Sequence, residues 1–243
     1  MKYMPISEVH NEDYKDFLKR LPYKFADIAI CDIPYGIGVG EMAFLKEMNT
    51  TVKQKNGTRL NGNRNKKPYT QKKWDNYVPD QSYFDELRRV SKHQIIFGVD
   101  YVDWSGLGNG RIKWDKGFAE EMSFKRYEVA YCSVIDYELT LPLLWAGMCQ
   151  AKSLSEPMTQ QGNKKLNERR IHPCHKPILL YRAILGMFTK EGDVIIDTHL
   201  GGGSNRIASY EMNRNFYACE IDEEYFRLEE KRFENFKAQG KLF

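Results

Sequence analysis

Two short apolar runs, each ending at an acidic residue, constrain the fold of this chain most. Residues 26–31 lead into Asp32-Ile33-Pro34-Tyr35, and residues 194–196 lead into Asp197 and the glycine-rich segment 200–204. Apolar runs of this length, rich in β-branched residues, predict buried strands. Open α/β sheets carry their chemistry just beyond the carboxyl ends of strands. We therefore expect both signals at one edge of a single sheet.

Strand and helix signals alternate along the rest of the chain, as a doubly wound sheet requires. The pattern predicts a Rossmann-like, doubly wound mixed α/β sheet of about seven strands with an antiparallel edge strand. The expected strands cover residues 26–31, 94–97, 111–114, 129–132, 194–197 and 215–220, and the expected helices cover residues 8–20 (with Ser7 as a cap), 81–90, 177–188, 204–212 and 223–237.

Length and composition indicate one soluble domain. A chain of 243 residues with 42% hydrophobic residues can fill one good core. No apolar run approaches the roughly 18 to 20 residues of a membrane span, and residues 1–5 lack the apolar core of a signal peptide. These features favour the cytoplasm.

The cysteine and histidine pattern does not favour a metal site. The five cysteines show no Cys-x-x-Cys pair. His172, Cys174 and His175 lie close together, but a zinc site needs about four converging ligands and no second cluster accompanies them. We predict no metal.

One segment is strongly basic although the formal net charge is only +4. Residues 49–73 contain no acidic residue and are rich in Asn, Gly and Thr, which is typical of a mobile loop. Its position directly after the Asp32 signal favours contact with nucleic-acid phosphates. Its basic residues are Lys53, Lys55, Arg59, Arg64, Lys66, Lys67, Lys72 and Lys73.

The later signal is typical of a nucleoside site. A strand with Asp197 at its tip, three glycines and then a helix describe a turn that a ligand can approach closely. Glu220, at the tip of the next expected strand, can accept hydrogen bonds from both ribose hydroxyls. The segment is neither a dinucleotide Gly-x-Gly-x-x-Gly nor a P-loop. It suits a methionine-derived nucleoside without phosphates.

The earlier signal is suited to gripping an amine on a nucleobase. The lone pair of an exocyclic amine is delocalised into the ring, so the amine is a poor nucleophile. The Asp32 carboxylate and the main-chain carbonyl of Pro34 can hold its two hydrogens and favour the tetrahedral, attacking geometry. Tyr35 supplies a face on which an extruded base can stack.

These motifs resemble those of the β-class amino-methyltransferases of nucleic acids. Asp32-Ile33-Pro34-Tyr35 is similar to the family's catalytic Asp-Pro-Pro-Tyr, and residues 172–177 to its His-Pro-x-x-Lys-Pro box. Residues 197–204 are similar to its Asp-Pro-Phe-x-Gly-Ser-Gly-Thr loop, and Glu220-Ile221-Asp222 to its ribose acid. Residues 95–98 and 113–116 resemble its middle strands. The catalytic half comes first and the cofactor half last, and this order of motifs defines the β class.

The resemblance implies an enzyme that uses S-adenosylmethionine to methylate N6 of adenine in double-stranded DNA after base flipping, as in restriction-modification. The catalytic residues would be Asp32, Pro34 and Tyr35. The cofactor would be held by Asp197, Leu200, Gly201, Gly203, Ser204, Glu220, Asp222, Lys176, His172 and Asp32. Arg169 and Arg170 would join the basic loop on DNA. A bacterial, phage or mobile-element origin and dimerisation also follow from the resemblance.

The same resemblance divides the chain into parts. Residues 1–243 would form one methyltransferase domain, with a catalytic half over about 1–134, a target-recognition region over about 135–171 and a cofactor half over about 172–243. The basic loop would be an insertion over about 46–76.

Two other functions remain open from the sequence. A cytosine-N4 enzyme has the same motifs, and adenine is favoured only because the motif begins with Asp rather than Ser. A catalytically silent DNA-binding module could keep the fold, but the presence of both Asp32 and Glu220 argues against it. The chain departs from the family at Ile33, Thr198 and His199, where the family has Pro, Pro and Phe. The last two changes are expected to alter affinity for the cofactor.

Overall fold

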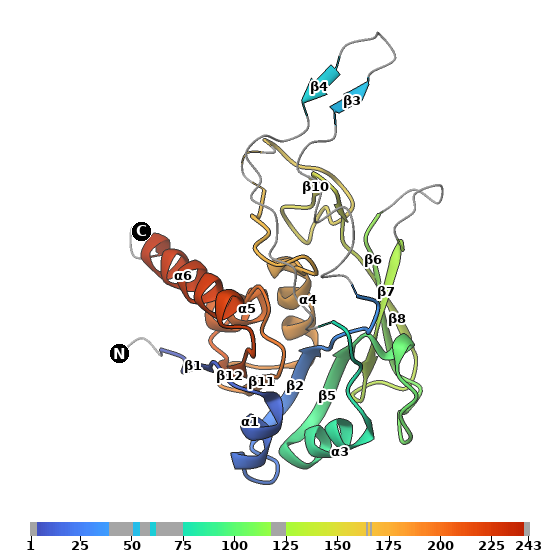
Figure 1. Ribbon diagram of the computed structural model, residues 1–243, viewed down its shortest axis with the longest axis vertical. Helices are drawn as coiled ribbons and strands as arrows, with labels where there is room; N and C mark the ends of the chain where they lie inside the picture. The colour runs from blue at the N-terminus through green and yellow to red at the C-terminus, as the bar shows by residue number, and fades with distance from the viewer. Residues whose placement is uncertain are drawn as a thin grey trace.

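The computed structural model describes residues 4–38, 51–53, 59–61, 75–117, 125–163, 165 and 167–240. Its main feature is an eight-stranded sheet in the order β1-β12-β11-β2-β5-β7-β6-β8 (Figure 1). The strands are β1 (Ser7–His10), β2 (Ala26–Asp32), β5 (Ser91–Phe97), β6 (Arg111–Asp115), β7 (Tyr127–Cys132), β8 (Glu138–Pro142), β11 (Val194–Asp197) and β12 (Asn215–Cys219).

Most neighbouring strands run parallel, and antiparallel pairing occurs only toward one side of the sheet. There β7 runs against both β5 and β6, and β8 then pairs in parallel with β6. The described residues also form two small hairpins, β3 (Thr51–Lys53) with β4 (Arg59–Asn61) and β9 (Trp145–Ala146) with β10 (Cys149–Gln150). The predicted doubly wound mixed α/β fold is confirmed.

Helices cover both faces of the sheet, because alternate residues of the central strands are apolar on both sides. Ile28 and Ile30 of β2 face a core formed with α4 (Ile178–Phe188) and α5 (Ser204–Glu211). Ala29 and Cys31 face a second core formed with α1 (Tyr14–Arg20) and α3 (Gln81–Val90). Strands buried on both faces are typical of parallel α/β sheets.

The last helix, α6 (Glu223–Gly240), lies with α4 and α5 in Figure 1. Its Glu229 forms an ion pair with Arg206 of α5, with 2.8 Å between carboxylate oxygen and guanidinium nitrogen. A buried pair of this kind fixes one helix against the other, because separating the partners would leave an unpaired charge inside the protein.

The helix predicted over residues 8–20 is wrong in its first part. Residues 7–10 form the strand β1, which pairs in parallel with β12, and the helix α1 begins only at Tyr14. The side chain of Asp13 accepts a hydrogen bond from the Lys15 N–H at 2.8 Å and so caps α1. A partner strand more than 200 residues away therefore decides the structure of residues 7–10.

The structure also adds detail to two segments expected to be irregular. The hairpin β3–β4 lies inside the basic stretch. Residues 138–142 form β8 of the main sheet, although their periodicity is weak. No helix in the described ranges is long and apolar enough to cross a membrane.

Candidate active site

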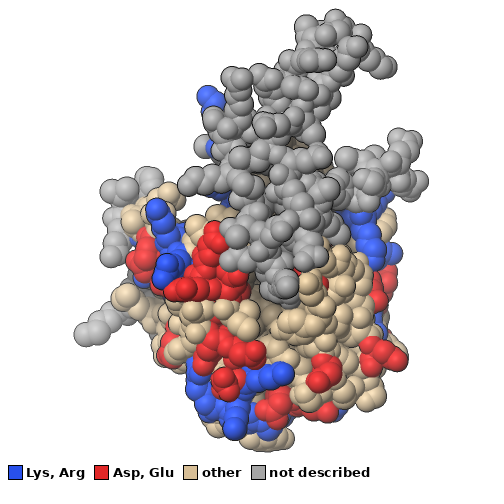
Figure 2. Space-filling view, in the orientation of Figure 1, with Lys and Arg blue, Asp and Glu red and all other residues tan. Residues whose placement is uncertain are grey.

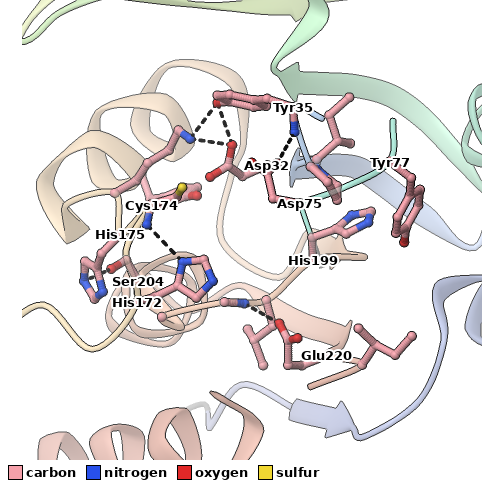
Figure 3. Close-up of a pocket in the computed structure, with 18 residues that line it drawn as sticks. Asp32, Tyr35, Asp75, Tyr77, His172, Cys174, His175, His199, Ser204 and Glu220 are labelled. Atoms are coloured by element: carbon pink, nitrogen blue, oxygen red, sulfur yellow. Dashed lines mark hydrogen bonds and ion pairs between the residues drawn. The ribbon is translucent and has the colours of Figure 1, made fainter. Parts of the chain in front are cut away.

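A pocket opens at the carboxyl ends of β2, β11 and β12. Strand β2 pairs directly with β11, in the register Ile196 opposite Ala29, so the two tips carrying Asp32 and Asp197 lie at the same edge. The order of strands along the chain reverses between β2 and β11, which is where ligands bind in sheets of this kind. Both sequence signals contribute to this pocket (Figure 3).

Two buried hydrogen-bond groups hold the neighbouring tips together. Asn205 of α5 donates from Nδ2 to the Ile30 carbonyl of β2 and to Oδ2 of Asp197, both at 3.0 Å. From the other face of the sheet, the hydroxyl of Tyr83 in α3 lies 2.6 Å from that of Thr198. The two halves of the site are therefore fixed relative to each other.

The carboxylate of Asp32 is held through one oxygen. The Tyr35 hydroxyl donates to Oδ1 at 2.8 Å, and the Lys176 ammonium forms an ion pair with the same oxygen. In Figure 3 Asp32 and Tyr35 point toward each other, with dashed lines joining both to this ammonium. Burial raises the pKa of Asp32 above its usual value, although the positive charge of Lys176 opposes this.

Lys176 joins Asp32 to a second carboxylate, Glu128 of β7. The ammonium lies 3.2 Å from Oε2 of Glu128, whose Oε1 lies 2.9 Å from the ammonium of Lys116. Burial opposes the charge on Lys176, but the two carboxylates raise its pKa. Despite the opposing effect of burial, the two ammonium groups lower the pKa of Glu128 to about 2. Lys176 and Glu128 are therefore both charged at neutral pH.

The ring and backbone of Tyr35 are tightly placed. The ring stacks on Tyr101 with centroids 4.8 Å apart and planes 11° apart. A Cβ at Gly98, which has a φ of +91°, would lie 2.3 Å from the Tyr35 ring. The carboxylate of Asp75 accepts the backbone N–H of Tyr35 at 2.7 Å and that of Gly36 at 3.2 Å. These contacts fix the turn that carries Pro34 and its carbonyl.

At the other end of the pocket a carboxylate supports the glycine turn. Glu220 accepts the Gly201 N–H on Oε2 at 2.8 Å and the Asp222 N–H on Oε1 at 2.9 Å. Each oxygen retains a second acceptor site. Burial raises the pKa of Glu220 above its usual value. The turn and the carboxylate offer backbone and acceptor groups rather than a cation, which fits a ribose better than a phosphate.

A buried polar network lies behind this turn. Nε2 of His175 lies 2.9 Å from Glu168 and 3.0 Å from the Ser204 hydroxyl, and Arg232 of α6 forms an ion pair with Glu168. A Cβ at Gly202 would lie 2.3 Å from the His175 ring, so this position requires glycine. The network connects residue 168, the start of α4 and the glycine turn, and so supports the shape of the pocket.

His172 and His199 are neutral groups at the pocket. Burial lowers the pKa of each to about 3. Nδ1 of His172 accepts the Cys174 N–H at 3.2 Å, and Nδ1 of His199 lies 2.9 Å from the Thr198 hydroxyl. Within the part of the chain that the structure describes, no group of three or more His, Cys, Asp or Glu side chains is arranged to hold a metal ion.

Comparison with known proteins gives the family. A family model described as DNA methylase, of the N6/N4 type, matches residues 41–231. The chain belongs to the N6/N4 DNA methylase family. Asp32, paired with Lys176, lies at one end of the pocket and Glu220 at the other (Figure 3). The methyl donor of these methylases is S-adenosylmethionine.

Individual relatives of this chain are more distant. It is 35% identical over 63 residues to the type II methyltransferase M2.DpnII of Streptococcus pneumoniae, which is 26% of this chain and 24% of that protein. It is 28% identical over 151 residues to the putative methylase YubD of Escherichia coli, covering 61% and 66% of the two chains. The matches thus cover about a quarter and just under two thirds of these relatives.

A solved structure confirms the fold. The PvuII cytosine-N4-specific DNA methyltransferase superposes with a TM-score of 0.52 over 96% of this chain and 89% of that chain, at 11% identity. At that identity the likeness concerns the fold only.

The pocket brings together most of the predicted catalytic and cofactor residues and leaves three of them beside it. Asp197 lies beneath the turn, where its oxygens accept the His199 N–H and the Asn205 amide. Gly203 precedes α5, and Asp222 accepts N–H groups in the first turn of α6. The predicted residues that line the pocket are Asp32, Pro34, Tyr35, His172, Lys176, Leu200, Gly201, Ser204 and Glu220.

The predicted DNA contacts fall mostly outside the described side chains. Arg169 is exposed, and Arg170 lies over the Trp145 ring at 4.4 Å and donates to the Gly147 carbonyl at 3.1 Å. For Lys53 and Arg59 only the backbone is described, in the β3–β4 hairpin. Lys55, Arg64, Lys66, Lys67, Lys72 and Lys73 lie outside the described residues.

Sequence reasoning missed Asp75 and Glu128. Asp75 is the first acidic residue after the basic stretch. That position could have marked it as a candidate site residue. Glu128 immediately precedes the expected strand 129–132, where a lone acid is typical of a solvent-facing position. Only the fold shows that it lies beside the Asp32 motif.

Proposed function

We propose that this protein transfers a methyl group from S-adenosylmethionine to the exocyclic amine of a base in DNA, with N6 of adenine as the acceptor. The observation that carries the proposal is the shared pocket, which Asp32 enters from β2 and the Gly201 turn and Glu220 enter from β11 and β12. Holding two reactants in contact supplies much of the acceleration of a bimolecular transfer.

The residues at the Asp32 end would hold and orient the amine. A free oxygen of Asp32 and the Pro34 carbonyl would each accept one amine hydrogen, which directs the nitrogen lone pair away from the ring. The Tyr35 ring would give up part of its stack on Tyr101 to contact the base. The base must leave the duplex first, because its amine is otherwise paired and shielded.

The residues at the Glu220 end would hold the methyl donor. Glu220 would accept the ribose hydroxyls beside the two backbone N–H groups that it already binds, and the Gly201 turn would pack under the nucleoside. When bound, S-adenosylmethionine would supply an electrophilic sulfonium methyl group to the amine lone pair, with the electrons of the broken carbon–sulfur bond remaining on sulfur as a neutral thioether. The methylated amine would then lose one proton to solvent.

The DNA itself would be held by Arg169 and Arg170 and by the basic side chains of the stretch 49–73. Arg169 is exposed a few residues before the His172 box, and the basic stretch 49–73 follows the Asp32 motif in the sequence. The segment 135–171 would supply sequence recognition as part of a single domain. Contacts to phosphates position a protein on DNA, whereas base contacts specify the sequence.

The choice of adenine rests on the first residue of the motif. Cytosine-N4 enzymes of this class more often begin with Ser, and this chain has Asp32. Cytosine-N4 is the alternative acceptor, because either base would present an exocyclic amine to the Asp32 carboxylate and the Pro34 carbonyl.

Expression in a host without DNA methylation, followed by sequencing that detects modified bases, tests the proposal directly. We expect N6-methyladenine at one recurring sequence. Asp32→Ala should lower the methylation rate at least about a hundredfold, because an amine acceptor is lost. Asp103→Ala, at an exposed aspartate outside the pocket, is the control.

Two outcomes would contradict the proposal. Marks on cytosine would assign the N4 reaction instead. No mark, together with no binding of S-adenosylmethionine in calorimetry, would indicate a silent DNA-binding module.

A further inference from the structure

Four charged side chains of alternating sign form a chain beside the Asp32 motif. Lys116 follows β6, Glu128 belongs to β7, Lys176 precedes α4 and Asp32 ends β2, so four separate segments contribute. Successive partners lie within ion-pair distance. The side chain of Lys176 is only 4% exposed, against 16% for Asp32 and 24% for Glu128. The buried ammonium is thus the centre of the chain.

Among the described residues, the hydrogen bond and the ion pair of the Asp32 carboxylate both fall on one oxygen. The Lys176 ammonium and the Tyr35 hydroxyl both bind Oδ1. A carboxylate held in this way presents its second oxygen in a fixed direction. That oxygen is the one that an amine hydrogen would need.

We propose that Lys176 and Glu128 are positioning residues for Asp32: Lys176 fixes one carboxylate oxygen, and Glu128 shares the ammonium so that it does not hold Asp32 too tightly. This assigns Lys176 to the catalytic carboxylate rather than to the cofactor, and gives Glu128 a role. The catalytic purpose of this arrangement rests on the proposed methyl transfer. The ion pairs themselves are independent of that proposal.

The role of Glu128 follows because it shares the Lys176 ammonium with Asp32. A buried ammonium that faced Asp32 alone would neutralise that carboxylate strongly and reduce its ability to accept a hydrogen bond. Glu128 lies 3.2 Å from the same ammonium and is itself bound by Lys116 at 2.9 Å. The four charges sum to zero, so the chain can be buried without a net charge.

The groups that face Asp32 set the direction of each expected effect. Lys176 favours the ionised carboxylate, and the Tyr35 hydroxyl donates to it. Glu128 opposes its ionisation. The other titratable groups influenced by its charge are Cys174, Tyr181 and Asp197. The pKa of Asp32 should therefore rise when Lys176 is neutralised and fall when Glu128 is neutralised.

A carboxyl NMR titration of the folded protein measures this without any turnover. Protein labelled with carbon-13 at the aspartate carboxyl would be titrated, and the Asp32 signal identified by its loss in Asp32→Asn. We expect Lys176→Met to raise the Asp32 titration midpoint by at least about one pH unit, a tenfold change in the equilibrium. Glu128→Gln should shift it in the opposite direction.

Two control variants each remove one charge, of a lysine or of a glutamate, from an ion pair elsewhere in the protein. Lys92→Met breaks an exposed pair with Asp27, in which nitrogen and oxygen lie 2.6 Å apart. Glu138→Gln breaks the exposed pair between Lys113 and β8. Neither should move the Asp32 midpoint. Circular dichroism checks the fold of each variant, and the downward shift in Glu128→Gln tests the inference even where Lys176→Met does not fold.

Methylation assays add a second readout. In Lys176→Met the acidic limb of the kcat profile should move to higher pH, with the Kd for S-adenosylmethionine unchanged within about twofold. Lys176→Arg should restore most of the wild-type profile, because it keeps the charge.

Several outcomes would overturn the inference. A tenfold loss of S-adenosylmethionine binding in Lys176→Met with an unmoved Asp32 midpoint would return Lys176 to the cofactor. Shifts of the same sign in both variants would overturn the role of Glu128. A wild-type protein that leaves no methyl mark but shows the two opposite shifts would refute the proposed function while upholding the charge chain.

Discussion

At the scale of single residues, the position of Tyr35 depends on the absence of a side chain at Gly98. This glycine directly follows β5 and has a φ of +91°, and a Cβ there would lie 2.3 Å from the Tyr35 ring and 3.1 Å from Ile33. The ring therefore packs directly against the backbone of the neighbouring strand while its hydroxyl reaches Asp32. One glycine thus sets the distance between a sheet strand and a motif side chain.

Replacing this glycine should impair catalysis. We expect Gly98→Ala to lower kcat for methylation at least tenfold, because the new methyl group displaces Tyr35 from Asp32. It should also lower the free energy of unfolding by roughly 1–3 kcal/mol through the clash and the left-handed backbone. Single-turnover kinetics and urea denaturation measure the two effects.

Gly192→Ala is the matched control. Gly192 has a φ of +85°, but no atom lies within 4 Å of its added Cβ. It shares the backbone strain without the clash, so its methylation rate should equal that of the wild type. Equal rates for Gly98→Ala and Gly192→Ala would show that the ring does not need this packing.

The side-chain partners of Lys176 could not be predicted from the sequence. The His-Pro-x-x-Lys-Pro box indicated a lysine at the cofactor, and in the structure Lys176 lines the pocket. Its partners Asp32 and Glu128 are distant in the sequence and belong to strands on either side of β5. A spacing pattern contains no information about which carboxylate a buried ammonium meets.

At the scale of elements, local patterns predicted most helices and strands well. The helix over residues 81–90 matches α3 in both bounds, because Asp80 caps it and its buried face has helical spacing. Residues 7–10 were misassigned because they carry no strong apolar alternation. They form a strand only because β12 offers an unpaired edge, and that edge is distant in the sequence.

The pairing of the two central strands depends on a polar residue of a helix. Asn205 of α5 satisfies the Ile30 carbonyl of β2 and a carboxylate oxygen of Asp197 at the tip of β11. The residue is only 1% exposed, so water cannot replace its amide. This single side chain thus connects the elements that carry the two halves of the pocket.

Removing the amide should destabilise the fold. Asn205→Leu preserves approximate volume but leaves two buried acceptors without this donor, and should lower the free energy of unfolding by about 2–4 kcal/mol. Asn163→Leu, at an exposed position, should cost less than about 1 kcal/mol. Urea denaturation compares them, and a variant at position 205 as stable as the wild type would contradict this role.

At the scale of the whole molecule, charge is distributed unevenly between the described body and the basic stretch. Lysine, arginine, aspartate and glutamate are mixed over the described surface visible in Figure 2. The sequence concentrates eight basic residues between positions 49 and 73 without an acid. Attraction to DNA should therefore come from a few segments rather than from the overall charge.

The salt dependence of DNA binding tests this distribution. Arg169→Ala should weaken binding to all sequences alike and reduce the slope of log K against log salt by about 0.9, the value for one lost phosphate contact. Arg227→Ala, on α6, removes an exposed arginine from an ion pair with Glu223 and should leave the slope unchanged. Fluorescence anisotropy at several salt concentrations gives both slopes, and an unchanged slope for Arg169→Ala would exclude it from the interface.

The pairing of β1 with β12 has a consequence for how the molecule is assembled. Ile6 accepts the Phe216 N–H at 2.9 Å, so the earliest-made strand finds its neighbour only when the last strand of the sheet has left the ribosome. Until then the sheet has an open border beside β11. Pairing strands so far apart in the sequence is slow, so the nascent polypeptide keeps these unpaired backbone groups exposed to proteases and to aggregation until β12 has been synthesised.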